Sequence, residues 1–396
     1  MGLNDTPKGE RIHIGIFGKR NAGKSSIINA ITGQNLSIVS DIKGTTTDPV
    51  SKGMELLPLG PVMITDTPGL DDEGILGKKR IEKAYQVLDK TDIALLVVDS
   101  LIGIQEEDDL ILNRIKEKGI PYITVMNKSE SLNISEDNNT DNVIYVSALT
   151  GKNIENLKEL ISKKAFKEDS KVIVSDLIHE SDKVILVIPI DKAAPKGRLI
   201  LPQQQTIRDI LDKGAVAVMC KEDELKNTIL SMKEKPSLVI TDSQVFKRVN
   251  EDTPKDTPLT SFSVLFARYK GEIDILIDGV RKVKELKDGD VILISEGCTH
   301  HRQCGDIGSE KIPKMLKKFT GKELNFEFSS GGEFPTDLSK YSLIVHCGGC
   351  MLNEREMKHR IHFAVNEGKK IVNYGILLAY LNGILSRAVK PLGIEI

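Results

Sequence analysis

The sequence predicts an α/β protein with parallel sheets, divided into three domains. Short apolar runs of strand length alternate with helical patterns along the chain, and this order is typical of parallel sheets. The alternation pauses at a charged segment, residues 162–171, and again at a loop rich in Asp, Thr and Pro, residues 251–258. Because 396 residues exceed one typical domain, we expect domains at 1–171, 172–264 and 265–396.

Each expected strand is a short aliphatic run, and each expected helix is a longer stretch with one apolar face. The first domain has strands at 12–17, 62–65, 93–98, 122–126 and 143–146, with helices that include 78–90 and 106–118. In the second domain, strands 183–190, 215–220 and 237–241 alternate with helices 203–213 and 222–235. The third has helix 272–286, strands 290–295 and 343–346, and helix 353–366. The apolar stretch 371–385 contains asparagines and glycines, which favours a buried strand and helix over a membrane span.

The composition argues against several classes of function. A formal net charge of −2 gives no electrostatic reason to expect nucleic-acid or membrane binding. Aromatic residues make up only 4% of the chain, without Trp, so stacking surfaces for bases are scarce. The N-terminal residues are polar and contain no apolar signal core, and the five cysteines are unlike a disulfide framework. We expect a cytoplasmic protein that binds neither nucleic acid nor membranes.

A phosphate-binding loop lies between the first expected strand and the helix that follows it. It consists of Gly18, Lys19, Arg20, Asn21, Ala22, Gly23, Lys24 and Ser25, and we include Ser26 in the site. The glycines let backbone amides surround the phosphates. The lysine at position 24 is placed to reach the β- and γ-phosphate oxygens, and Ser25 is suited to ligate Mg²⁺.

Four further motifs follow in the order that a GTPase requires. The first contains Thr45 and Thr46 and offers a threonine hydroxyl to Mg²⁺. The second offers the carboxylate of Asp66 to the Mg²⁺ shell and the amide of Gly69 to the γ-phosphate. The other two each follow a strand and fit base-binding loops, with Asn127, Lys128, Glu130, Ser147 and Ala148. We therefore predict a Ras-like P-loop domain that binds and hydrolyses GTP, with Lys24, Thr46, Asp66 and Gly69 as its catalytic residues.

This part of the chain resembles the translation-factor-like GTPases of the Era/TrmE branch. The resemblance implies that Thr46 ligates Mg²⁺, with Thr45 as the second choice, and that Asn21 helps to hold K⁺. Leu70 stands where Ras-type enzymes have the glutamine that orients water, so we expect slow hydrolysis stimulated by K⁺. Glu130 departs from the pattern, because the guanine-binding loop normally ends in Asp. The added methylene loosens the expected guanine selectivity, although GTP is still favoured over ATP.

A second group of chemistry-bearing residues lies in the third domain, at Cys298, His300, His346, Cys347 and Cys350. Its two halves follow the expected strands 290–295 and 343–346, and loops at the carboxyl ends of parallel strands share one edge of the sheet. Thiolates and imidazoles suit both Zn²⁺ and iron–sulfur clusters. A closed zinc site would use Cys298, His300, Cys347 and Cys350, whereas a [4Fe–4S] cluster on the three cysteines would leave one iron with an exchangeable ligand. Residue types alone leave both metals open, and the absence of any metal as well.

The whole pattern resembles the HydF family, the maturation GTPases of [FeFe]-hydrogenases. It combines Cys-x-His and His-Cys-x-x-Cys with an Era/TrmE-like GTPase domain, and the segment 197–205 is similar too. The resemblance implies a [4Fe–4S] cluster on the three cysteines, with His300 and His346 as matching candidates for a variable fourth ligand. It also implies a homodimer formed through the middle domain.

The same resemblance implies a scaffold and carrier. The protein would hold a di-iron subcluster bearing CO, cyanide and dithiolate ligands and deliver it to apo-hydrogenase, with the two radical-SAM maturases as further partners. Two other functions stay open. One is an RNA-associated GTPase of the Era/TrmE kind with a structural zinc module, and the other is a GTPase whose nucleotide affinity senses the state of a metal cluster.

Overall fold

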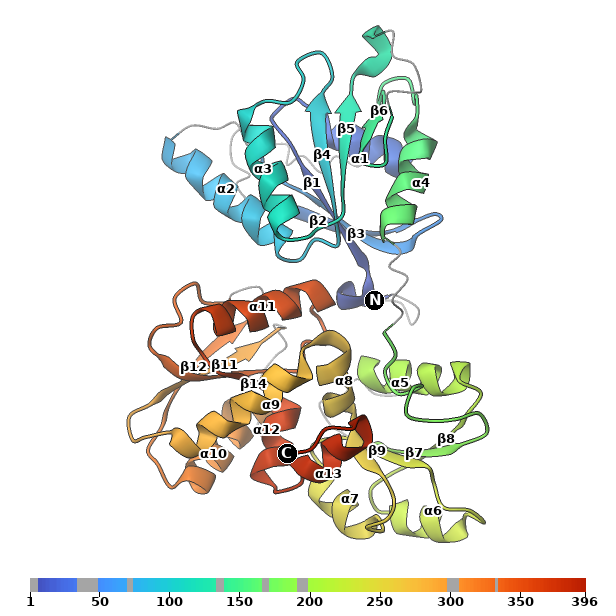
Figure 1. Cartoon of the computed structure of the whole chain (residues 1–396), viewed down its shortest axis with the longest axis vertical. Coiled ribbons are helices and arrows are strands. Elements are labelled where there is room, and N and C mark those ends of the chain that lie inside the picture. The colour runs from blue at the N-terminus through green and yellow to red at the C-terminus, as the bar shows by residue number, and fades with distance from the viewer. Residues whose placement is uncertain are drawn as a thin grey trace. The chain divides into compact units, whose positions relative to one another are not determined.

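The computed structural model describes residues 6–33, 49–69, 74–132, 139–165, 171–190, 199–297, 306–331 and 334–396. The chain divides into two compact units, Met1–Asp169 and Ser170–Ile396, which Figure 1 shows in blue to green and in green to red. Among the described residues, no helix combines the length and the apolar character that crossing a membrane requires.

The first unit is built on one six-stranded sheet with the order β2-β3-β1-β4-β5-β6. Its strands are β1 (Ile12–Phe17), β2 (Val50–Leu56), β3 (Gly60–Asp66), β4 (Ile93–Asp99), β5 (Tyr122–Asn127) and β6 (Val143–Tyr145). Its helices are α1 (Lys24–Thr32), α2 (Gly74–Leu88), α3 (Glu106–Glu117) and α4 (Ile154–Ala165), with the 3₁₀ turns η1 (Lys8–Glu10) and η2 (Ser129–Ser131). The five expected strands are confirmed, and all are parallel. The antiparallel edge strand β2 was not predicted, because most of its residues are exposed and form no apolar run.

Alternating side chains of the central strands fill two separate cores, one on each face of this sheet. Ile14 and Ile16 of β1 belong to the core that α1 and α4 cover, whereas Phe17 belongs to the core beneath α2 and α3. Burial on both faces is the reason that these strands are continuous apolar runs in the sequence. The covering helices leave the carboxyl ends of the strands as the edge where the site loops begin.

The second unit contains two four-stranded sheets, both entirely parallel. The first has the order β10-β9-β7-β8, with β7 (Lys183–Val187), β8 (Val216–Cys220), β9 (Leu238–Thr241) and β10 (Leu259–Ser261). Its helices are α5 (Leu201–Asp212), α6 (Leu225–Ser231), α7 (Phe246–Asp252) and α8 (Phe262–Lys270). The three expected strands and two expected helices of this segment are confirmed, while β10, α7 and α8 were not predicted.

The second of these sheets has the order β12-β11-β13-β14, with β11 (Val291–Glu296), β12 (Asn325–Ser330), β13 (Tyr341–His346) and β14 (Ile371–Asn373). Its helices are α9 (Ile273–Arg281), α10 (Ile312–Thr320), α11 (Glu354–Asn366), α12 (Tyr374–Leu381) and α13 (Leu385–Val389), with short turns η4 (Lys282–Glu285), η5 (Ile307–Lys311) and η6 (Lys390–Leu392). The stretch 371–385 is a buried strand followed by a helix, as expected.

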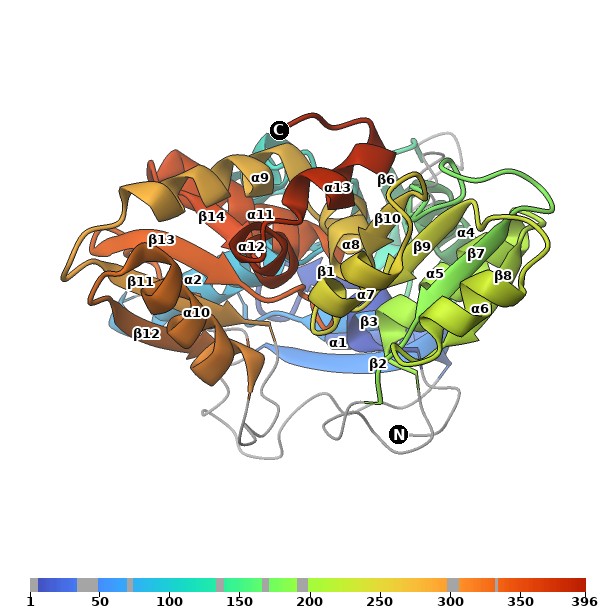
Figure 2. The ribbon, with the colours of Figure 1, turned by 90° about the horizontal axis from the view of Figure 1, so that it is seen from below.

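A single hydrophobic core joins the two sheets of the second unit. It contains Ile185 and Val239 from the first sheet and Ile292 and Ile344 from the second. Helices α8 and α12 contact each other and lie between the sheets in both views (Figures 1 and 2). The boundary expected near residue 264 falls inside α8, and the division of this unit into two domains stays a proposal.

Candidate functional site

The phosphate-binding loop is shaped by two glycines at the carboxyl end of β1. Gly18 has φ +139°, and a Cβ added to it would lie 2.2 Å from the Val97 carbonyl oxygen. Gly23 has φ +94°, and its Cβ would lie 2.2 Å from Nδ2 of Asn127. Asn21 between them also has a positive φ, 64°, a conformation that asparagine tolerates better than most residues. The backbone therefore curls tightly before α1 begins.

Lys24 and its neighbour place a cation and a hydroxyl at the start of α1. The Lys24 ammonium is largely buried and donates to the carbonyls of Gly18 and Lys19, at 2.9 and 2.8 Å. The Ser25 hydroxyl donates to Oδ2 of Asp66, at 3.2 Å, at the end of β3. This hydrogen bond joins the P-loop to the Asp-x-x-Gly motif. Ser25 and Asp66 are the two side chains that the sequence analysis assigned to the Mg²⁺ shell.

Asp66 has the character of a metal-shell carboxylate. Burial raises its pKa, opposed by the charge of Lys24 and the Ser25 hydrogen bond. Its second oxygen, Oδ1, is buried and finds no hydrogen-bond partner among the described residues. A buried oxygen without a donor is costly unless something else satisfies it, and a hard oxygen ligand of this kind suits Mg²⁺. The residues present therefore fit the ion. Thr45 and Thr46 lie outside the described residues.

Asn127 fastens the base-binding loops to the phosphate loop. Its Nδ2 donates to the Ala22 carbonyl, at 3.1 Å, and its Oδ1 accepts from the Ala148 amide, also at 3.1 Å. The Lys128 ammonium pairs with Asp99 at the end of β4, at 2.6 Å. One amide side chain thus holds three loops of the expected nucleotide site in fixed relation.

Glu130 is the position where the sequence departs from the usual guanine-binding motif. Its carboxylate is exposed and accepts a hydrogen bond from the Ser147 side chain, which lowers the pKa of Glu130. The carboxylate therefore faces the second base-binding loop and is ionised. Of the remaining predicted residues, Arg20 and Ser26 are exposed, and Lys19 forms an ion pair with Glu107 of α3 at 2.6 Å. Gly69 lies just past the end of β3.

The two strands that precede the expected metal ligands, β11 and β13, end side by side. These strands are parallel neighbours, with Ser295 beside His346. The Cys347 amide donates to the Ser295 carbonyl at 2.8 Å, and the Gly297 amide donates to Sγ of Cys347 at 3.1 Å. Cys298 and His300 lie outside the described residues. Among the described residues, the Cys347 loop contacts the end of β11 up to Gly297, the residue that directly precedes Cys298.

The surroundings of the two described cysteines supply hydrogen-bond donors and a positive charge. Sγ of Cys347 accepts a second amide hydrogen bond, from Gly349 at 3.4 Å, and such bonds stabilise and tune cluster sulfurs. Burial raises the pKa of the Cys350 thiol, against the charge of Lys270. That lysine is buried and donates to the Leu352 carbonyl at 3.2 Å. Thiols, amides and an ammonium suit an anionic, thiolate-bound group, although the described residues contain no cluster of three or more His, Cys, Asp or Glu side chains.

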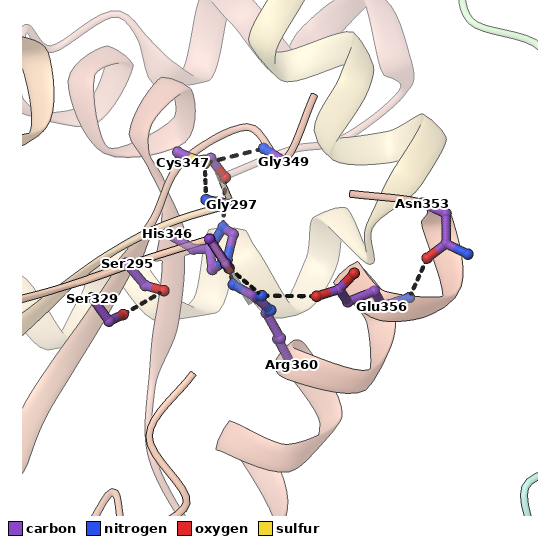
Figure 3. Close-up of polar contacts among 10 residues, drawn as sticks. Ser295, Gly297, Ser329, His346, Cys347, Gly349, Asn353, Glu356 and Arg360 are labelled. Atoms are coloured by element: carbon purple, nitrogen blue, oxygen red, sulfur yellow. Dashed lines mark hydrogen bonds and ion pairs between the residues drawn. The ribbon is translucent and has the colours of Figure 1, made fainter. Parts of the chain in front are cut away.

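His346 is fully buried and both of its ring nitrogens contact protein atoms (Figure 3). Nδ1 lies 2.7 Å from the Cys347 carbonyl, and Nε2 lies 3.1 Å from a guanidinium nitrogen of Arg360. Burial, and then the charge of Arg360, lower the pKa of His346 to about 3, so the imidazole is neutral. These contacts argue against His346 as a direct ligand, in contrast to its place among the sequence candidates, because its acceptor nitrogen is already occupied.

Two functional candidates were not found from sequence, namely Lys270 and Arg360. Both are charged residues on helices, and the helix that carries Arg360 is rich in Lys and Arg, which predicts a solvated face. The structure buries both side chains beside the cysteine loops. Only the start of the helix, directly after Cys-x-x-Cys, marks this region in the sequence.

Three family models match the chain. The first is described as 50S ribosome-binding GTPase, over residues 13–128. The others are the hydrogen maturase F dimerization domain, over residues 173–271, and the hydrogen maturase F tetramerization domain, over residues 274–391. Together with the sheet order of the first unit, the first match shows a Ras-like P-loop GTPase domain.

Curated relatives that are GTPases match part of the chain. The tRNA modification GTPase MnmE of Nitrosomonas europaea is 37% identical over 160 residues, which cover 39% of this chain and 35% of the relative. GTPase Der of Kosmotoga olearia is 37% identical over 129 residues, 31% of this chain and 29% of the relative. The chain thus spans about a third of the length of these relatives. Among solved structures, Aquifex aeolicus Era bound to GDP·AlF4⁻ is 19% identical with a TM-score of 0.34, covering 81% of this chain and 92% of Era.

Proposed function

Because this chain belongs to the hydrogen maturase F family, we propose that it carries a [4Fe–4S] cluster and delivers a di-iron subcluster to apo-[FeFe]-hydrogenase. The family and its GTPase domain mark the protein as a hydrogenase maturation GTPase. The observation that supports the carrier role is the hydrogen bond from Gly297 to Sγ of Cys347. It joins the residue directly before Cys298 to Cys347, and Cys298, Cys347 and Cys350 are the three expected ligands.

The cluster site would hold its guest through a position that the cysteines do not fill. A [4Fe–4S] cluster on three thiolates supplies one iron with an exchangeable ligand, and the di-iron subcluster is the substrate that docks there. The chain's own residues orient and screen this group. Amides of Gly297 and Gly349 donate to Cys347, and Lys270 places a positive charge near Cys350. His300 is kept as a candidate fourth ligand.

The nucleotide site would hydrolyse GTP slowly and with help from K⁺. Lys24 neutralises charge on the phosphates, Ser25, Thr46 and Asp66 serve Mg²⁺, and the Gly69 amide meets the γ-phosphate. Asn21, which has a left-handed backbone conformation in the loop, would help to hold K⁺. The energy of GTP binding and hydrolysis biases contacts with the hydrogenase and the two radical-SAM maturases in the cytoplasm, and drives no bond chemistry at the cluster.

The homodimer would form through the open edge of the first sheet of the second unit. Among the described strands, β8 pairs only with β7, so one side of its backbone is available. Val216 and Met219 on this strand are about half exposed, at 48% and 55%. An open edge with apolar side chains is a template for pairing with another chain, and β8 lies within the segment described as a dimerization domain.

Anaerobic iron–sulfur reconstitution followed by EPR of the reduced protein tests the carrier role. Cys298→Ser, Cys347→Ser and Cys350→Ser should each abolish the cluster signal, whereas Cys220→Ser, at the end of β8, should leave it intact. GTP turnover should rise when Na⁺ is replaced by K⁺, and Asn21→Ala should remove that difference. A colourless protein that holds one zinc ion and no iron would contradict the proposal and support the zinc-bearing RNA-associated GTPase instead.

A further inference from the structure

Arg360 is a buried cation at the centre of a network beside the cysteine loops. It lies on α11 and its side chain is only 2% exposed. One guanidinium nitrogen contacts Nε2 of His346 at 3.1 Å, and the other donates to the Gly331 carbonyl and to Glu356, both at 2.8 Å. The guanidinium also lies over the Phe334 ring, 5.3 Å from its centre. Figure 3 shows this guanidinium between Glu356 and His346.

The chemistry of these partners fixes the tautomer of His346. A guanidinium only donates hydrogen bonds, so Nε2 of His346 must be the acceptor nitrogen. The Cys347 carbonyl only accepts, so Nδ1 must carry the proton and donate to it, at 2.7 Å. Arg360 therefore selects the one imidazole form that can hold the peptide of Cys347.

Cys347 is held at three points, and one of them depends on His346. Its carbonyl accepts from His346, its amide donates to Ser295 at 2.8 Å, and its Sγ accepts from Gly297 at 3.1 Å. The charge of Arg360 is balanced by Glu356 one turn earlier on α11, and the backbone amide of Glu356 is bound by the side chain of Asn353, which caps the helix. Helix α11 thus fixes the position of Cys347 through the side chains of Arg360 and His346.

We infer that Arg360 is a positioning residue for the cluster ligand Cys347 and acts through His346. The inference rests on the proposed function, since it takes Cys347 to be a ligand. Loss of a residue that orients a metal ligand by a hydrogen bond typically lowers metal affinity by about 10- to 100-fold. Without the guanidinium, the acceptor nitrogen of His346 loses its donor, the imidazole is free to change tautomer, and the Cys347 peptide is released.

The test uses the full chain, reconstituted anaerobically, with the variants Arg360→Met, His346→Ala and the double variant. The readouts are iron and sulfide content, the EPR spectrum, the reduction potential, and the rate of iron loss to a ferrous chelator. Arg360→Met should lose iron about tenfold faster than the wild-type chain and show an altered spectrum. His346→Ala should do the same, and the double variant should be no worse than His346→Ala alone. Arg281→Met, at an arginine whose side chain is 76% exposed on α9, is the matched control and should match the wild type.

The outcomes separate this inference from the function beneath it. A wild-type chain that takes up no iron overturns the proposed function and the inference with it. A normal wild-type cluster with additive effects of the two substitutions, or with wild-type behaviour in Arg360→Met, overturns the inference alone. A nitrogen hyperfine coupling in the EPR spectrum that disappears in His346→Ala would show that His346 binds iron directly, and it would also overturn the inference. If Arg360→Met does not fold, Arg360→Lys serves. It keeps the charge, but its single ammonium nitrogen does not reproduce the two separate terminal nitrogens of the planar guanidinium. It should therefore lose iron faster than the wild type, while an unchanged rate overturns the inference.

Discussion

Gly297 directly precedes Cys298 in the chain, and an added methyl group there should disturb the loop of Cys347 and Cys350. A Cβ at this position would lie 2.7, 2.9 and 3.2 Å from Cγ, Cδ1 and Cδ2 of Leu352. Carbon atoms prefer separations of about 3.5–4.0 Å, so one partner must move by roughly 1 Å. Leu352 is 4% exposed, and its carbonyl accepts from Lys270. It therefore has little room to retreat, and Gly297→Ala should push β11 away from the Cys347 loop.

The cost of this overpacking should be about 1–3 kcal/mol. Hydrogen exchange of the apo protein measures it locally, in peptides that cover β11 and β13. If these amides exchange through opening of the second unit, their exchange should accelerate by about 5- to 150-fold. The reconstituted Gly297→Ala variant should also lose iron faster, because the hydrogen bond from residue 297 to Cys347 is displaced.

Gly348 provides the matched control on the facing loop. It is exposed, its φ is not positive, and among the described residues no atom lies within 4 Å of an added Cβ. Gly348→Ala should therefore leave exchange unchanged or slow it slightly, since alanine restricts the unfolded chain. Leu352→Ala combined with Gly297→Ala should be less destabilising than the sum of the two single changes. If Gly297→Ala exchanges like the wild type and keeps its cluster, the steric argument is refuted.

Three further predictions concern the nucleotide site and the stability of each unit. Glu130→Asp should raise the preference for GTP over ATP by about tenfold, measured by competition against a fluorescent GTP analogue; equal competition in both proteins would contradict the assigned role. Arg387 of α13 donates to five oxygens of residues 250–257. Arg387→Met should therefore lower the unfolding free energy by about 2 kcal/mol and the melting temperature of the second unit by about 4–8 °C. An unchanged melting temperature would show that these contacts contribute nothing to stability. Burial lowers the pKa of His13 despite its hydrogen bond to the Lys8 carbonyl. The unfolded chain therefore binds the proton first as pH falls below about 6.5, and the unfolding free energy of the first unit should fall by up to about 1.4 kcal/mol per pH unit, a dependence that His13→Gln should reduce.

The central strands could be predicted from the sequence because burial on both faces makes each one a continuous aliphatic run. The edge strands β2 and β12 could not, because their exposed faces break that run: β2 is mostly exposed, and β12 has the sequence NFEFSS. The P-loop, the Asp-x-x-Gly motif and the two base-binding motifs could be located from the sequence because each is short and lies at the end of its own strand. The parallel pairing of β11 with β13 agrees with the rule that parallel strands gather their carboxyl ends, and the convergence of the two cysteine loops stays a prediction.

The network around Arg360 could not be predicted in this way. An arginine on a helix rich in charged residues indicates a solvated position, and only the fold brings His346 from β13 and Gly331 beyond β12 to the same guanidinium. Lys270 is a similar case, since the carbonyl it binds is 82 residues away in the chain. Pairs of this kind depend on packing between elements that carry no common motif. His346 was among the ligand candidates because it matches the His-Cys-x-x-Cys pattern of the resemblance, and that pattern carries no sign of its contact with Arg360.

The shared core of the second unit has a consequence for how its two segments behave when they are separated. The family models divide the chain between residues 271 and 274, yet Val264, Ala267, Ile273 and Leu276, on both sides of that division, are buried in one cluster. A fragment ending at residue 271 would present a bare apolar face to water, as would the remainder beginning at 274. Each fragment should therefore aggregate when produced alone. The two should become soluble when they are co-expressed, because together they complete one hydrophobic core.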